Sequence, residues 1–218
     1  MRPTSNVCFL RKKLPYDSEV EFIKSTGTQY IKTGIPFDSK QLEFSLKMDF
    51  ENNLTGWSDE FMGAFVSDSS DSTGVRMRIY GDNSGEIDCS FMNSPRLSPG
   101  LGNHAKVRNN GTTTTTLKQG ECVVRKGTTV LARKTSGNAS GTPCGLEIYL
   151  FAGNQNNNAF RISTGMMLKT FTIKKGDVLV QDLIAVRVGT EGCMYDKVTG
   201  TLLHNAGTGD FILGDDKN

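Results

Sequence analysis

Long hydrophobic runs are absent from this chain of 218 residues. The longest apolar stretch, residues 148–152, has the length of a buried strand, whereas a helix needs about 20 apolar residues to cross a bilayer. At the start of the chain, Arg2 is followed by Pro3 and then by polar residues, where the apolar part of a secretory signal would begin. We therefore expect no membrane-spanning segment and no export signal.

Cysteine and histidine are scarce. Five cysteines are scattered along the chain without a Cys-x-x-Cys pair: Cys8, Cys89, Cys122, Cys144 and Cys193. An odd, dispersed set in a chain without an export signal is typical of reduced thiols, so we expect a protein that assembles in a cytosol. Only two histidines occur, His104 and His204, which excludes a histidine-rich metal site. We therefore predict no metal and no cofactor.

Proline is limited to six residues and long amphipathic helical patterns are missing, whereas glycine is plentiful, with 24 residues. This composition favours strands joined by tight turns. Over nine residues, apolar side chains occupy every second position and alternate with polar ones: Leu42, Phe44, Leu46, Met48 and Phe50. That period of two predicts a strand with one buried face.

Further strand patterns and turn signals follow along the chain. The other strong strand signals are the ranges 61–66, 75–80, 146–152 and 168–188, the last of them a hairpin. Residues 112–116 are five threonines between two turn signals, and we interpret them as a strand near a sheet edge. Residues 154–158 are interpreted as a polar loop. Regularly spaced short strands predict an all-β fold in which two antiparallel sheets pack as a sandwich.

Positive charge is concentrated at the start of the chain. The net charge is +2, yet residues 1–13 carry four basic side chains and no acidic one: Arg2, Arg11, Lys12 and Lys13. We interpret residues 1–19 as a basic arm that tethers the domain, residues 20–218, to a neighbour; the alternative is an ordinary solvated terminus. Four charges are too few to hold the phosphates of a nucleic acid, so we expect no direct nucleic-acid binding.

Catalytic motifs are incomplete. Glu86 and Asp88 have the spacing of two carboxylates that some glycoside hydrolases place on one strand, but no third carboxylate follows at residue 90 or 91. Without that general acid the leaving oxygen cannot be protonated. Neither histidine lies in a nucleophile motif, and we interpret Cys193 as a small packed residue, leaving open a dyad of distant cysteine and histidine. We therefore expect a protein that is not an enzyme.

Two loops contain candidate binding residues. The single tryptophan, Trp57, follows a predicted strand in a polar loop, where an exposed indole could stack on a sugar ring. Tyr80 and Asn83 are secondary candidates for the same glycan site; the alternative is that Trp57 closes the end of the sandwich or makes a subunit contact. Asp68 and Asp71 lie in a loop that either holds calcium or is simply a solvated acidic loop.

Two blocks of sequence resemble a known family. The first lies within residues 14–34 and contains LPYDSEVEFI, STGTQYI and TG. The second lies within residues 171–211 and contains FTI, LVQDLI, MYD and NAGTGDF. Together they resemble the LamG-like, concanavalin A-like jelly-roll domains of gut Bacteroidales (crAss-like) phages and of their hosts. Within these blocks we expect Tyr30, Tyr195 and Phe211 to close the sandwich where the terminal strands meet.

The resemblance implies a function as well as a fold. Members without an export signal are virion proteins, so it implies a non-catalytic capsid decoration (auxiliary capsid), head-fibre or tail component. Such a protein would contact other virion proteins and copies of itself as a homo-oligomer, with weak adhesion to cell-surface glycans as a second expectation. One alternative is a carbohydrate-binding, lectin-like module of a phage fibre or host surface protein, and another is a degenerate hydrolase.

Overall fold

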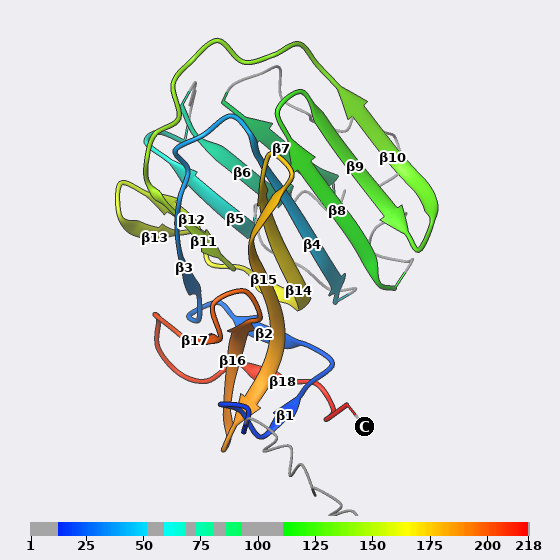
Figure 1. Cartoon of the computed structure of the whole chain (residues 1–218), viewed down its shortest axis with the longest axis vertical. Helices are drawn as coiled ribbons and strands as arrows, with labels where there is room; N and C mark the ends of the chain where they lie inside the picture. The colour runs from blue at the N-terminus through cyan, green and yellow to red at the C-terminus, as the bar shows by residue number, and fades with distance from the viewer. Residues whose placement is uncertain (1–12, 52–58, 69–72, 81–85, 93–110, 218) are drawn as a thin grey trace, which may run out of the picture.

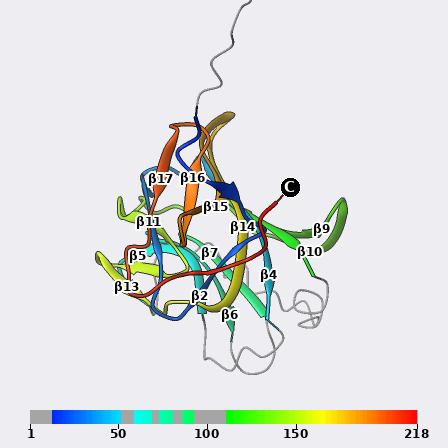
Figure 2. The same ribbon diagram turned by 90° about the horizontal axis from the view of Figure 1, so that it is seen from below.

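The computed structural model of the protein describes residues 13–51, 59–68, 73–80, 86–92 and 111–217. Within these ranges the chain is all-β, and its strands form two sheets (Figure 1). In Figure 2 strands β5, β11 and β13 lie on one side of the molecule and strands β4, β14, β9 and β10 on the other. The predicted two-sheet, antiparallel sandwich is therefore confirmed. None of the described residues forms a helix long and apolar enough to cross a membrane.

The larger sheet contains 11 strands among the described residues, and neighbouring strands in it are antiparallel. Its main path runs β10-β9-β8-β4-β14-β15-β16-β17. The bounds are β1 (Ser18–Glu19), β2 (Ile23–Thr26), β4 (Leu42–Phe50), β8 (Thr113–Lys118), β9 (Glu121–Lys126), β10 (Thr129–Thr135), β14 (Thr164–Lys175), β15 (Val178–Val188), β16 (Glu191–Asp196), β17 (Thr201–Leu203) and β18 (Ile212–Leu213).

The smaller sheet contains seven strands among the described residues. They are β3 (Ile31–Pro36), β5 (Asp59–Phe65), β6 (Val75–Tyr80), β7 (Glu86–Phe91), β11 (Glu147–Leu150), β12 (Gly153–Gln155) and β13 (Asn158–Phe160). Strand β5 is central: one of its edges pairs with β6, and the other pairs with β11 and, in parallel, with β12. Strand β6 then pairs with β7.

The core lies between the two sheets. Every second residue of β4 is buried, as its sequence pattern predicts, and the apolar residues of β6 face the same interior. Phe44 of β4 and Phe91 of β7 meet across the sandwich with their ring centroids 6.5 Å apart. Each large apolar side chain buried in this way contributes about 1.5–3 kcal/mol, so the packing of the two inner faces is the main force that holds the sheets together.

Within the larger sheet, β14 pairs with different strands along its length. One edge of this strand pairs with β4, while its other edge pairs first with β2 and then with β15. Strand β15 continues past this point and pairs with β16 and β1. Strands β1, β15, β16 and β17 therefore form an extension of the sandwich, drawn at the lower end of Figure 1.

A second, smaller apolar cluster stabilises this extension. Its buried members are Ile184 and Val186 of β15 and Cys193 of β16. Tyr16 packs against the cluster, and its ring lies 5.0 Å from the ring of Tyr195. The last residues of the expected arm thus lie against the domain, while Arg2, Arg11 and Lys12 lie outside the described residues and Lys13 is exposed.

Phe211 and Tyr30 close the sandwich as predicted, whereas Tyr195 packs instead against the small cluster of the extension. Phe211 is buried, and its ring centroid lies 4.9 Å from that of Phe151; Tyr30 lies 5.2 Å from Tyr149. A Cβ atom at Gly207 would meet the carbonyl oxygen of Thr28 at 1.9 Å, so only glycine fits where these segments cross.

Two local predictions are wrong. The threonine run forms β8, but β9 and β10 lie between it and the sheet edge, because the polar hairpin that follows adds two more strands. The loop predicted at 154–158 is instead a hairpin of β12 and β13, whose turn residues Asn156 and Asn157 have positive φ values of 51° and 69°. Asparagine tolerates this left-handed conformation better than most residues, which permits so tight a turn.

Candidate functional site

The outer surface of the smaller sheet, away from the core, carries a group of charged side chains that we call the charged face. Its members are Glu60, Asp68, Arg76, Arg78, Asp88 and Arg161. Strand alternation explains their position, because Val75, Met77 and Ile79 of β6 point into the core and the two arginines between them point outward. Charged residues on an outer surface are normally solvated, yet four of these six are buried.

The charged face is connected by ion pairs. Arg76 pairs with Glu60, and its Nη1 atom lies 2.9 Å from Oδ1 of Asp68. Arg161, the residue after β13, reaches the same carboxylate, with 2.9 Å between its Nη2 atom and Oδ2. Arg78 pairs with Asp88 on the neighbouring strand, with 2.7 Å between Nη2 and Oδ2. Asp68 therefore contacts both a near neighbour in the sequence, Arg76, and Arg161, which is 93 positions away.

Two glycines leave space for the ring of Phe65 beneath these ion pairs. A Cβ atom at Gly153 would lie 2.5 Å from the ring of Phe65, and one at Gly63 would lie 3.1 Å from it. Because both positions lack a side chain, the Phe65 ring can lie flat over the backbone of β5 and β12. The guanidinium of Arg76 stacks over this ring, 4.4 Å from its centroid.

The electrostatics of the charged face follow from burial and pairing. Burial raises the pKa of Glu60, and the charge and hydrogen bonds of Arg76 offset this only in part. Partial burial also disfavours the charge on Asp68, but its hydrogen bond to Arg76 and the charges of the three arginines lower its pKa below the usual range. Asp68 therefore stays ionised and organises the arginines around it.

One edge of the charged face reaches solvent. The side chains of Asp68 and Arg161 are 34% and 35% exposed, in contrast to Glu60, which is fully buried. Phe160 is half-buried beside them, and the Arg161 guanidinium lies 4.8 Å from its ring centroid. This edge combines an acceptor, a planar donor and an aromatic ring, which is the chemistry that recognises vicinal hydroxyl groups and the apolar face of a sugar.

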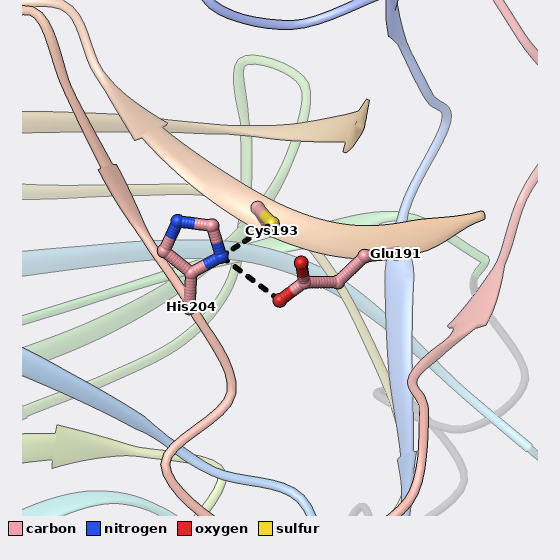
Figure 3. A group of neighbouring side chains, drawn as sticks. All are labelled: Glu191, Cys193 and His204. Atoms are coloured by element: carbon pink, nitrogen blue, oxygen red, sulfur yellow. Dashed lines mark hydrogen bonds and ion pairs between the residues drawn. The ribbon is translucent and has the colours of Figure 1, made fainter. Parts of the chain in front are cut away.

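A second group of reactive side chains lies on the extension of the larger sheet. Figure 3 shows Glu191, Cys193 and His204 pointing toward one another. The Nδ1 atom of His204 lies 2.9 Å from Oε1 of Glu191 and 3.5 Å from Sγ of Cys193. The three donor atoms all lie within 4.8 Å of one another. We call this group the Glu-Cys-His cluster.

The strand register positions the Glu-Cys-His cluster. Glu191 and Cys193 are two residues apart on β16 and therefore share one face of the sheet. Met194 pairs with Leu203 of β17, so the next residue, His204, lies opposite Cys193. Its neighbour Asn205 is held by a bridge to Ile31. The backbone on both sides of the imidazole is therefore fixed.

The geometry does not support a cysteine-histidine catalytic pair. In such a pair one imidazole nitrogen contacts the thiol and the other contacts the orienting group, whereas here Cys193 and Glu191 both face Nδ1 of His204. Burial and the nearby Glu191 carboxylate raise the pKa of Cys193 to about 12. The uncharged thiol is a poor nucleophile at neutral pH.

Most of the predicted glycan-site residues lie outside the described part of the chain. Trp57 and Asn83 lie outside the described residues, and of Tyr80 only the backbone is described, as the last residue of β6. Asp71 also lies outside, and Asp68 pairs with arginines. The glycan site predicted from Trp57, Tyr80 and Asn83 therefore stays a prediction.

The structure shows where Asp88, one of the two carboxylates of the incomplete motif, lies. Asp88 is buried in its ion pair with Arg78, which fits a polar strand residue better than an exposed nucleophile. Cys193 is packed, as predicted, but it also belongs to the Glu-Cys-His cluster, which the sequence analysis missed. The available signal was the alternation Glu-x-Cys on one strand, with a histidine directly after the next strand of the hairpin.

Comparison with known proteins identifies a shared fold but no family for this chain. No family model and no curated protein matches the chain. A crystal structure of a putative carbohydrate binding protein from Bacteroides ovatus matches with a TM-score of 0.52 and 11% identity. The match covers 90% of this chain and 61% of that protein, so the chain spans about three-fifths of its length. At this identity the likeness shows a shared sandwich fold, in agreement with the expected concanavalin A-like jelly roll.

Weaker matches include the CBM40 module of the Ruminococcus gnavus IT-sialidase, with a TM-score of 0.43 and 11% identity over 75% of this chain and 95% of that one. The Scytalido-glutamic peptidase, in complex with a peptide-based transition state analogue, matches with a TM-score of 0.35 and 11% identity, over 88% of this chain and 100% of that one. Likenesses at this level carry no argument. No comparison supports an association with phage virions, and the expected place in a virion and homo-oligomer stay predictions.

Proposed function

We propose that the protein is a carbohydrate-binding module that holds a glycan at the exposed edge of the charged face. The observation that carries this proposal is the arrangement of Asp68, Arg161 and Phe160, in which a carboxylate, a guanidinium and an aromatic ring lie side by side and are partly open to solvent. A sugar ring offers two adjacent hydroxyls to such a carboxylate and guanidinium, and its C–H face to the ring.

Pre-organisation supports the proposal. Asp68 is fixed by three arginines and Arg161 is fixed by Asp68 and Phe160, so neither side chain loses much freedom when a ligand binds. The Bacteroides ovatus protein with the same type of sandwich is described as a putative carbohydrate binding protein, which agrees with this function.

Charge balance indicates the class of glycan. Each arginine of the charged face already has a carboxylate partner, in the pairs Arg76–Glu60, Arg78–Asp88 and Arg161–Asp68. An acidic sugar would have to displace Asp68 from Arg161 to form an ion pair. We therefore expect a neutral glycan, bound through its hydroxyl groups.

The test is a glycan array that carries neutral and sialylated glycans, followed by titration of the best ligand. We expect Arg161→Gln and Asp68→Asn each to weaken the binding of a neutral glycan by roughly 10- to 100-fold, the effect of losing a hydrogen bond to a charged group. The matched control is Arg133→Gln, which removes an arginine paired with Glu121 on the larger sheet.

Three results would contradict the proposal. The first is an array without any bound glycan, and the second is unchanged affinity in Arg161→Gln at unchanged thermal stability. The third is full loss of binding in Trp57→Ala with Arg161→Gln unaffected, which would place the ligand at the loop predicted from the sequence. A preference for sialylated glycans would overturn the expected class of ligand.

A further inference from the structure

We propose that Glu191, Cys193 and His204 form a binding site for a zinc ion. The site is independent of the proposed glycan site, because it lies on the extension formed by β15, β16 and β17 rather than on the smaller sheet. Thiolate, imidazole and carboxylate are the three side-chain ligands that zinc takes in proteins.

The distances fit one metal ion. Ligand atoms about 2.0–2.3 Å from a tetrahedral zinc ion lie roughly 3.3–3.6 Å from one another. The observed separation of 3.5 Å between Sγ of Cys193 and Nδ1 of His204 agrees with this value. The 2.9 Å between Nδ1 of His204 and Oε1 of Glu191 would lengthen by a few tenths of an ångström, which the exposed Glu191 side chain can supply by a small rotation.

The contacts within the cluster direct three different ligand types to one small region. Oε1 of Glu191 and Sγ of Cys193 both face Nδ1 of His204, rather than contacting opposite sides of the ring. When Nδ1 carries no proton and the thiol is deprotonated, a divalent cation between these atoms would bind a nitrogen, an oxygen and a sulfur ligand at once.

The site is both fixed and accessible. Cys193 is fully buried within the small apolar cluster, whereas the His204 and Glu191 side chains are 53% and 42% exposed. Zinc would therefore enter from solvent, where it would meet two exposed ligands and one buried ligand. Three protein ligands leave the fourth tetrahedral position to a water molecule.

Binding has a defined proton balance. His204 binds as a neutral imidazole through Nδ1, with its own proton on Nε2, and Glu191 binds as a carboxylate. The thiol of Cys193 must lose its proton, which passes to the buffer as the sulfur–zinc bond forms. No electron is transferred, and zinc remains divalent.

The experiment uses the full chain, treated with EDTA, desalted and kept reduced with a phosphine. Cobalt(II) is the spectroscopic probe: we expect binding at a ratio of one to one, with a thiolate-to-cobalt charge-transfer band and the visible bands of a tetrahedral ion. Zinc should displace the cobalt and raise the melting temperature of the protein. In Cys193→Ser the charge-transfer band should vanish, and zinc affinity should fall by more than about 100-fold, beyond the loss that a missing supporting hydrogen bond causes.

Matched variants separate this site from the other thiols and the other imidazole. Cys144→Ser and His104→Gln should bind metal as the original chain does. His204→Gln, at an exposed position, should lose zinc affinity and the zinc-induced rise in melting temperature even if Cys193→Ser fails to fold. A charge-transfer band that persists in Cys193→Ser, or an unchanged zinc affinity in His204→Gln, would overturn the proposal.

Discussion

At the scale of single residues, β8 contains two buried hydroxyl groups on the strand face that packs against the apolar core. Thr113 and Thr115 face the core and are 1% and 0% exposed, and neither Oγ1 atom has a hydrogen-bond partner among the described residues. A buried hydroxyl without a partner costs about 1–3 kcal/mol of stability. The shape of threonine suits a strand, but its hydroxyl does not suit this environment.

Thr115→Val should therefore stabilise the protein by about 1–2 kcal/mol, because valine keeps the branched shape and removes the unpaired hydroxyl. The measurement is the urea midpoint at an unchanged dependence on denaturant. Thr114→Val is the matched control: its side chain is half-buried on the opposite face of the strand, and we expect a change within about 0.5 kcal/mol. A lower midpoint for Thr115→Val would contradict this account.

Single residues are also where sequence-based prediction worked least well for the candidate sites. The charged face depends on Asp68 contacting Arg161, which is 93 positions away, and only the pairing of β5 with β12 brings them together. The Glu-Cys-His cluster depends on the register of β16 and β17. Neither the pairing of β5 with β12 nor the register of β16 and β17 can be read from residue types and local spacing. Prediction from the sequence therefore favoured candidates in loops and did not identify either group.

At the scale of elements, two strands from different sheets bring their thiols together. Cys89 of β7 and Cys122 of β9 are both buried in the core, with 3.1 Å between their sulfur atoms. Both are free thiols. The hydrogen bond to Cys122 and burial raise the pKa of Cys89 well above its ordinary value, so the thiolate is rare and oxidation is slow.

Mild oxidation with a diazene such as diamide should join the two strands. The two thiols give up two hydrogens to the diazene and form a disulfide, and the diazene becomes a hydrazine. Because the cysteines are 33 positions apart, the chain-entropy estimate for the closed loop is a gain of about 3–4 kcal/mol. Mass spectrometry should show the loss of two hydrogens together with a higher urea midpoint.

Cys122→Ala provides the control, since it cannot form the bridge and should show no oxidation-dependent rise in stability. If the oxidised original chain did not lose two hydrogens, the two sulfur atoms would not be as close as the structure places them. A bridged chain with an unchanged urea midpoint would contradict the expected gain in stability.

Elements were predictable where the local pattern was strong. The alternation of β4 fixes its bounds at Leu42–Phe50, and the hairpin of β14 and β15 follows from two apolar runs around a glycine-containing turn. Strands β12 and β13 have three residues each and few apolar side chains, so their pairing depends on tertiary contacts with β5. Such short strands carry no periodic signal of their own.

At the scale of the whole molecule, the end of the expected N-terminal arm is part of the domain. Ser18 and Glu19 pair with Arg187 and Val186 of β15, and Tyr16 covers the small apolar cluster. The basic charge that suggested an arm lies earlier in the chain, so the predicted tether and the residues that pack against the domain are different parts of the same segment.

Truncation should separate these two roles. The chain without residues 1–19 should be less stable than the chain without residues 1–13 by about 2 kcal/mol or more, since it loses β1 and the cover of a buried cluster. Thermal melting of both truncated chains would measure the difference. Equal melting temperatures would mean that residues 14–19 do not stabilise the extension. Mass spectrometry of washed phage particles with each form would test the predicted virion tether.

The two described ends of the chain lie side by side at one pole of the molecule. Val20 bridges to Asp216, and the amide of Glu21 donates to the carbonyl of Asp215. A mechanical load applied to the two ends would act across the strands and separate these pairs one after another. It would not act along the strands, where the pairs would be loaded together in shear. Tension would therefore peel β1 and β18 from the domain first, and the facing sheets would bear the load only after both had detached.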